Sequence, residues 1–78
     1  MKPYIVYILQ CSDGSYYTGC THDIKKRLWR HAAGHGSKYV SSRRPFKVVR
    51  YEKYWRAEEA YRREVEIKRM SRMEKQSL

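Results

Sequence analysis

Two tyrosines ten residues apart, Tyr7 and Tyr17, are followed along the chain by Arg27 and His31. A phenol can exchange a proton or donate a hydrogen bond, an imidazole titrates near neutral pH, and a guanidinium can bind two phosphate oxygens at once. These groups together are suited to handling a phosphate. A carboxylate, Glu64, comes later and falls within an apolar helical stripe rather than among solvent-facing charges. The elements between these residues decide whether all five can meet.

The first element is a strand, because every residue from Tyr4 to Leu9 is apolar or aromatic and the run is rich in β-branched side chains. Such a run predicts a central strand that is covered on both faces. Ser12-Asp13-Gly14 supplies a turn, and Ser15 to Thr21 is predicted to return as the second strand of a hairpin.

The length of the turn decides whether the two tyrosines share a face of the sheet. A two-residue loop would place them on opposite faces. A three-residue loop, with Gly14 in the left-handed position, pairs Leu9 with Tyr17 and Tyr7 with Gly19. We predict the three-residue loop, with both phenols on one face and the glycine leaving Tyr7 uncovered.

A helix is expected next, capped by Thr21 or Asp23 and ended by Gly34. Its core-facing positions are predicted to include Ile24, Leu28 and Trp29, while Arg27 and His31, four residues apart, share another stripe.

The rest of the chain is predicted to add a third strand and a second long helix. The expected segments are a connection with a short helical turn at 34–45, a strand at 46–54, a helix at 56–70, and a short helix or frayed tail at 71–78. On the long helix the apolar stripe carries Ala57, Ala60, Tyr61 and Ile67 around Glu64. The fold class is therefore α/β, a small three-stranded sheet flanked by helices in the order strand, strand, helix, short helix, strand, helix. With 78 residues, positions 1–78 form a single domain.

The charge balance indicates an anionic partner. The chain has 18 Lys and Arg residues against 8 Asp and Glu, a net charge of +10, and its 41% hydrophobic content excludes a disordered basic tail. Nine basic residues and no acidic one lie between Ile24 and Tyr51, which favours contact with nucleic-acid phosphates. The candidate nucleic-acid-binding residues are Gly19, Lys26, Arg30, Lys38, Tyr39, Arg43 and Arg44. No helix has the character of a groove-inserting recognition element, so little base-sequence specificity is expected.

Two cysteines, Cys11 and Cys20, lack the spacing of a zinc site or redox pair and are interpreted as reduced thiols. The apolar run near the N-terminus is too short for a signal peptide or a membrane span, so a cytoplasmic protein without a membrane partner is expected.

The ordered set of a tyrosine-bearing first strand, Tyr17-Thr18-Gly19, Lys26-Arg27-Leu28, His31 and Glu64 resembles the GIY-YIG nuclease superfamily. The resemblance covers essentially the whole chain. The small stand-alone bacterial members are most similar, since they share the stretch from Leu9 to Gly14, Gly36-Ser37-Lys38-Tyr39 and Arg44-Pro45. Ile5 and Thr18 replace a glycine and an isoleucine of the name-giving motif, and neither change removes a reactive group.

The resemblance implies a metal-dependent endonuclease or DNase, with DNA favoured over RNA, that hydrolyses phosphodiester bonds and belongs with DNA-repair enzymes. Glu64 would hold one Mg²⁺ or Mn²⁺ ion, because these ions bind through few protein ligands and retain waters. Arg27 would stabilise the transition state, and Tyr17 would hydrogen-bond phosphate or water. Tyr7 or His31 would be the general base. A phenol of ordinary pKa, about 10, needs a nearby cation such as Arg27, Lys26 or the metal to act at neutral pH.

Alternatives remain open at this point. Each tyrosine could be a sheet aromatic with its hydroxyl at the rim, and His31 a cation at the end of its helix. Glu64 could pair with Lys68, leaving Glu66 as the metal ligand. The whole chain could be a noncatalytic nucleic-acid-binding module, and a targeting protein or a second copy could be a further partner.

Overall fold

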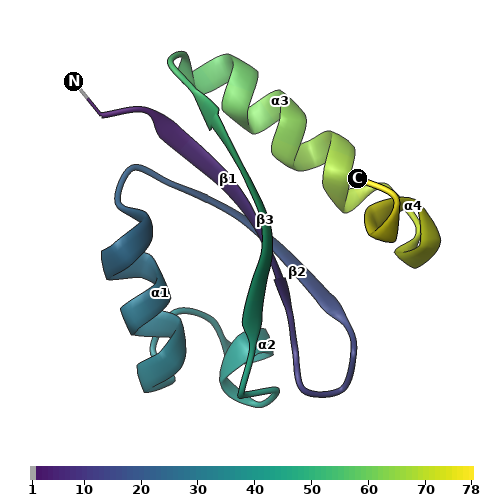
Figure 1. The fold of residues 1–78 in the computed structure, drawn as a ribbon. Helices are drawn as coiled ribbons and strands as arrows, with labels where there is room; N and C mark the ends of the chain where they lie inside the picture. The colour runs from purple at the N-terminus through teal and green to yellow at the C-terminus, as the bar shows by residue number, and fades with distance from the viewer. Residues whose placement is uncertain (1) are drawn as a thin grey trace.

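A computed structural model describes residues 2–78. The chain forms one antiparallel sheet with helices on both faces, as Figure 1 shows. The elements are β1 (Tyr4–Gln10), β2 (Tyr16–Thr21), α1 (Ile24–Ala33), α2 (Lys38–Ser41), β3 (Lys47–Tyr54), α3 (Ala57–Lys68) and α4 (Arg72–Gln76). The strand order is β2-β1-β3, which confirms the predicted α/β class and the central position of the first strand.

The β1–β2 hairpin has the predicted three-residue loop. The N–H of Cys11 donates to the carbonyl of Ser15 at 2.8 Å, and Gly14 takes a left-handed φ of 82°. Tyr7 therefore lies opposite Gly19, and Leu9 lies opposite Tyr17. This register puts both phenols on one face of the sheet.

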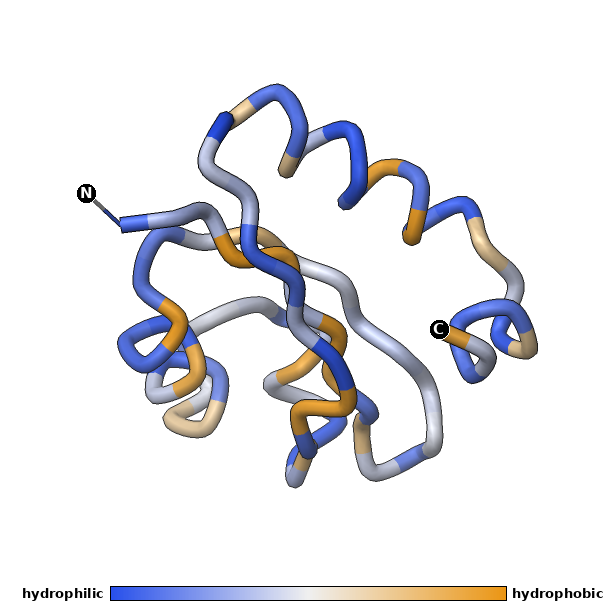
Figure 2. The backbone as a smooth tube through the Cα atoms, turned by 45° about the horizontal axis from the view of Figure 1, so that its top comes forward, coloured by the Kyte–Doolittle hydropathy of each residue, from blue (hydrophilic) through white to orange (hydrophobic). Residues whose placement is uncertain are grey.

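Each face of the sheet has its own apolar core. On the side of α1 and α2, Ile5, Tyr7 and Leu9 pack with Val40. On the opposite side, Val6 and Ile8 pack against α3. Figure 2 shows α3 as mainly hydrophilic with separate apolar positions, as expected for a helix that buries one narrow stripe.

Helix α1 confirms most of the prediction for its segment. Asp23 caps the helix by accepting a hydrogen bond from the N–H of Lys26, and Gly34 ends it. Trp29, however, is 68% exposed, and the buried residue of the helix is His31. The reason is angular: Ile24, Leu28 and His31 follow one another at i, i+4 and i+7, so that the stripe facing the sheet passes through His31 and leaves Trp29 to one side.

The long helix differs from its prediction in one position. Ala60 and Ile67 are buried as expected, but Tyr61 is 53% exposed and only its ring edge meets Tyr4, with the centroids 6.1 Å apart. The tail forms α4, whose start is fixed by a reciprocal capping box between Ser71 and Glu74. Within residues 2–78 no helix has the length and apolar character needed to cross a membrane.

Candidate active site

Three of the predicted site residues meet between β1, β2 and α1. The Tyr7 hydroxyl lies 2.9 Å from Nε2 of His31, and both side chains are fully buried. The Tyr17 ring meets His31 edge-on at 5.3 Å and lies 6.5 Å from the Tyr7 ring, measured between centroids. The hairpin register and the helix stripe together create this cluster, since each places its own members on the same face.

Two glycines permit these rings to lie so close to the backbone. A Cβ on Gly19 would overlap the Tyr7 hydroxyl and ring, and a Cβ on Gly36 would overlap Nδ1 of His31. The absence of a side chain at Gly19 was expected to leave Tyr7 uncovered, and this was wrong, because the phenol occupies that space and is not exposed at all.

The Tyr7 hydroxyl is a weak acid in this surrounding. Burial raises the pKa of Tyr7 to about 12, although the nearby guanidinium of Arg27 opposes the rise. The charge of Tyr17 and that of Glu64 add to the increase. In the protein alone, Arg27 does not bring the pKa of Tyr7 below its ordinary value, because desolvation outweighs the guanidinium.

His31 is held in its neutral form. Burial, with a smaller contribution from Arg27, lowers the pKa of His31. Its Nδ1 atom is buried without a hydrogen-bond partner among residues 2–78. The pair can form in either direction, because one neutral tautomer donates the Nε2 proton to the Tyr7 oxygen and the other accepts the phenol proton at Nε2.

Glu64 approaches the cluster from the other face of the sheet. Helix α3 covers the opposite face, yet the Glu64 charge raises the pKa of both Tyr7 and Cys20, and Arg27 lowers both. Glu64 and Arg27 therefore lie within electrostatic range of the same two groups near β2, the edge strand of the sheet. The side chain of Glu64 is 19% exposed, and its one ionic partner among residues 2–78 is Lys68 at 3.5 Å.

Glu66, the alternative metal ligand, is placed differently. Its carboxylate is 56% exposed and accepts a hydrogen bond from Arg63. Glu66 is not among the charges that shift the pKa of Tyr7, whereas Glu64 raises it. The pairing of Glu66 with Arg63 and the electrostatic effect of Glu64 on Tyr7 thus favour Glu64 over Glu66 as the carboxylate of the cluster.

Arg27 also lines a small open cavity at the start of α1. The cavity has a volume of about 190 Å³, and its other lining residues are Thr21, Asp23, Lys26 and Arg30. Three of the lining side chains, those of Lys26, Arg27 and Arg30, are basic and lie on neighbouring turns of α1, so the cavity suits an anion. Within residues 2–78 Arg27 forms no ion pair with a carboxylate.

The basic residues of the α2 region divide into exposed and internally bonded ones. Lys38 is exposed, and Tyr39 is 36% exposed with its ring stacked on Tyr17. Arg43 pairs with Asp13 at 3.1 Å and lies over the Tyr39 ring, so its guanidinium is occupied within the protein.

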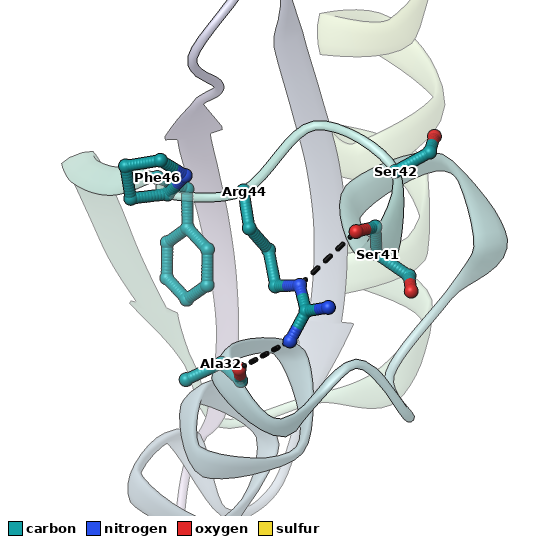
Figure 3. A pocket seen from close by; sticks show the side chains of 6 residues that line it. Ala32, Ser41, Ser42, Arg44 and Phe46 are labelled. Atoms are coloured by element: carbon teal, nitrogen blue, oxygen red, sulfur yellow. Dashed lines mark hydrogen bonds between the residues drawn. The ribbon is translucent and has the colours of Figure 1, made fainter.

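Arg44 is also a structural residue in this arrangement. Its guanidinium donates to the carbonyls of Ala32 and Ser41, which joins the end of α1 to α2 beside Phe46 (Figure 3). These bonds cross a cavity of about 450 Å³ that lies apart from Tyr7 and Glu64. The prediction that Arg43 and Arg44 bind nucleic acid receives no support from these contacts, because both side chains already satisfy backbone or carboxylate oxygens.

Some residues at the site were not predicted from the sequence. Gly36 packs against His31, and the hydroxyl of Thr18 is buried without a hydrogen-bond partner in the part of the chain that the structure describes. Two lysines, Lys68 and Lys75, line a groove beside Tyr17. Gly36 and Thr18 had a sequence signal in the Gly36-Ser37-Lys38-Tyr39 and Tyr17-Thr18-Gly19 stretches, and Lys68 had one in its spacing from Glu64.

Comparisons with known proteins find relatives that are similar in sequence and in fold. The UPF0213 protein BH0048 of Halalkalibacterium halodurans is 48% identical over 73 residues, covering 94% of this chain and 78% of that protein. A UPF0213 protein of Staphylococcus saprophyticus is 45% identical over 78 residues, covering all of this chain and 95% of that protein. The solution structure of protein EF2693 from E. faecalis superposes with a TM-score of 0.71 at 35% identity, covering 99% of this chain and 82% of that one.

The family model described as the GIY-YIG catalytic domain matches residues 3–77. Its match points to the nuclease superfamily and implies a nucleic-acid substrate, while the names of the relatives specify no activity. The extent of the match includes every element that positions Tyr7, Arg27, His31 and Glu64, and on this basis the chain belongs to the GIY-YIG family.

Proposed function

We propose that this protein is a metal-dependent endonuclease that hydrolyses phosphodiester bonds, in DNA rather than RNA, with little sequence specificity. The observation that supports it most is the gathering of a phenol, an imidazole, a guanidinium and a carboxylate around β2, with Arg27 and Glu64 lacking strong partners among the described residues. A structural charge would be expected to pair within the protein.

Glu64 fits the role of a metal ligand. Its carboxylate is partly buried and is engaged only with an ammonium at 3.5 Å, so its oxygens are available to a cation. Within residues 2–78 no three acidic, histidine or cysteine side chains converge, so an ion would take its remaining ligands from phosphate and water. This donor set suits Mg²⁺ or Mn²⁺. A bound ion would stabilise negative charge developing on the phosphate and would replace the negative field of Glu64 at Tyr7 with a positive one.

Tyr7 is the better candidate for the general base, with His31 as its positioning residue. In the tautomer with the proton on Nε2, His31 would donate to the phenol oxygen and stabilise the phenolate, and the same nitrogen would not accept a proton. A phenol with a pKa of about 12 is almost wholly protonated at pH 7, and because burial is the main cause of the rise, exposure of the phenol together with a nearby cation would lower its pKa.

Arg27 would bind the phosphate and stabilise the transition state. Tyr7 is fully buried, so water reaches its hydroxyl only if a neighbouring side chain moves. Arg27 lies beside the phenol and lines an open cavity, and a phosphate would draw its guanidinium outward through two charge-assisted hydrogen bonds. Binding of the substrate would then expose the base.

A nicking assay on supercoiled and branched DNA, with Mg²⁺ or Mn²⁺, tests the proposal. We expect the wild type to cleave, EDTA to stop cleavage, and Glu64→Gln to reduce the rate at least about 100-fold, as loss of a main electrostatic contact does. Glu66→Gln is the matched control, two residues away on the same helix, and should cleave normally.

Two outcomes would change the conclusion. If Glu64→Gln cleaved as well as the wild type, the metal assignment would be wrong. If the wild type bound DNA but cleaved none with either metal, the alternative function would hold, a noncatalytic nucleic-acid-binding module that retains the fold.

A further inference from the structure

A second groove lies beside β2, on the side away from the α1 cavity. Its volume is about 260 Å³, and it is lined by Tyr16, Tyr17, Thr18, Tyr39, Lys68 and Lys75. The lining comes from α2 on one face of the sheet and from α3 and α4 on the other. The groove therefore runs along the β2 edge of the sheet. Tyr17 lines this groove and also contacts His31, so the groove adjoins the candidate active site.

The edge of β2 presents unused hydrogen-bond donors to this groove. Because Cys11 and Ser15 form a hydrogen-bonded pair and such pairs alternate along an antiparallel ladder, the backbone N–H of Thr18 points away from β1. The Thr18 side chain is also unusual: the residue is 3% exposed, and its hydroxyl has no partner among residues 2–78. A buried hydroxyl beside an open groove is satisfied when a ligand supplies the missing oxygen.

Two lysines supply positive charge at the opposite wall. Lys68 lies 3.5 Å from Glu64, so it connects the groove with the carboxylate of the site. Lys75 is half-buried and has no ionic partner within the described residues. Its helix, α4, is held by the Ser71–Glu74 capping box, and Met70 just before it packs into the α3-side core. Lys75 is thus placed by a defined structure and not by a free tail.

We propose that this groove binds the backbone phosphate adjacent to the one that is cleaved. Lys75 and Lys68 would neutralise this phosphate, and the Thr18 hydroxyl and N–H would donate to its oxygens, while the two tyrosines line the path between the phosphates. This inference rests on the proposed nuclease function and adds a substrate subsite to it. The ligand is an internal phosphodiester, in keeping with a groove that continues directly from the site.

The test is the salt dependence of DNA binding, measured by fluorescence anisotropy with a labelled oligonucleotide in EDTA so that no cleavage occurs. Loss of one phosphate contact lowers the slope of log Kd against log salt by about 0.7 to 0.9. We expect this decrease for Lys75→Gln and recovery of the slope for Lys75→Arg. Lys53→Gln, which removes the same charge from β3 at the other edge of the sheet, is the matched control and should leave the slope unchanged.

A second arm locates the phosphate. Neutral methylphosphonate groups, introduced one at a time, should weaken wild-type binding at one internal position at which Lys75→Gln is insensitive. A Lys75 effect seen only with a terminal phosphate would overturn the inference in favour of an end-binding pocket. Thermal unfolding followed by circular dichroism confirms that each variant is folded.

The outcomes separate the two proposals. If Lys75→Gln and the wild type gave the same slope, the subsite would be disproved, while metal-dependent nicking that is lost in Glu64→Gln would still stand. If the wild type bound no DNA, both proposals would fail together.

Discussion

Two carboxylates twelve residues apart, Glu52 and Glu64, lie in opposite electrostatic situations. Glu52 on β3 accepts hydrogen bonds from Arg50, Arg63 and Tyr54, each with a contact at 2.8 Å. These partners lower the pKa of Glu52 to about 2, with Arg63 as the largest cause. Glu64 has only a lysine at 3.5 Å.

The arginines of the two regions differ in the same way. Arg63 uses its guanidinium for Glu52 and Glu66, and these contacts raise the pKa of Arg63. Arg27 lies beside a neutral phenol and an open cavity. Charged side chains that pair with each other, such as Glu52 and Arg63, hold α3 on the sheet. Arg27 and Glu64, in contrast, do not pair with each other and remain available to a ligand.

The largest effects are expected when each of the two arginines, Arg27 and Arg63, is replaced separately. Arg27→Ala should reduce cleavage by about 100-fold to 1,000-fold, because one positioned charge is lost from the transition state, and should leave stability nearly unchanged. Arg63→Ala should do the reverse. Nicking rates and urea unfolding of both variants measure this, and equal stability losses in the two would remove the distinction between the regions.

The Glu52 network predicts a defined dependence on acid. Its folded pKa of about 2 is below the ordinary value of 4.5, so its contribution is fully present above pH 4.5 and is lost as the pH falls toward 2. We expect Glu52→Gln to lower the free energy of unfolding by about 3 kcal/mol at pH 7, and the difference from wild type to shrink over that window. Chemical unfolding at several pH values measures it. A difference independent of pH would contradict the ionic explanation.

Gly19→Ala probes the packing of the site itself. The new methyl group would overlap the Tyr7 ring, so we expect a loss of about 1–3 kcal/mol of stability together with loss of cleavage. In a Tyr7→Ala background the same substitution should cost much less, because the overlapping ring is gone. Additive losses in this double-mutant cycle, measured by thermal unfolding, would show that the two residues do not compete for space.

The smallest change in stability is expected from loss of the Lys68–Glu64 ion pair. Lys68 is 55% exposed, so Lys68→Gln should change stability by less than about 0.5 kcal/mol, far less than loss of the Glu52 pairs. Urea unfolding at low and high salt measures this. A loss comparable with that of Glu52→Gln would mean that Glu64 is a structural carboxylate after all.

The sequence predicted the sheet and its register well because the decisive signals are local. A three-residue turn with Gly14 determines which residue faces Tyr7, and a short apolar run identifies the central strand. The helix boundaries followed from caps such as Asp23 and Gly34 for the same reason.

The remaining features depend on contacts between distant segments. The burial of His31 and the exposure of Trp29 follow from how α1 lies on the sheet, which helical spacing alone left ambiguous. The internal bonds of Arg44 require carbonyls of Ala32 and Ser41 that only the folded chain brings together. The net pKa of Tyr7 is a balance between burial and one guanidinium, and no spacing rule reveals which of the two is larger.

The open edge of β2 also bears on contacts between two copies of this chain. An exposed strand edge can accept a strand from another molecule, and such pairing would close the groove and cover the candidate site. The net charge of +10 makes two copies repel each other while it attracts a polyanion. The net positive charge therefore favours binding of a nucleic acid at this edge over pairing of two copies. Replacing surface lysines with neutral residues to improve stability would increase the risk of aggregation at the site.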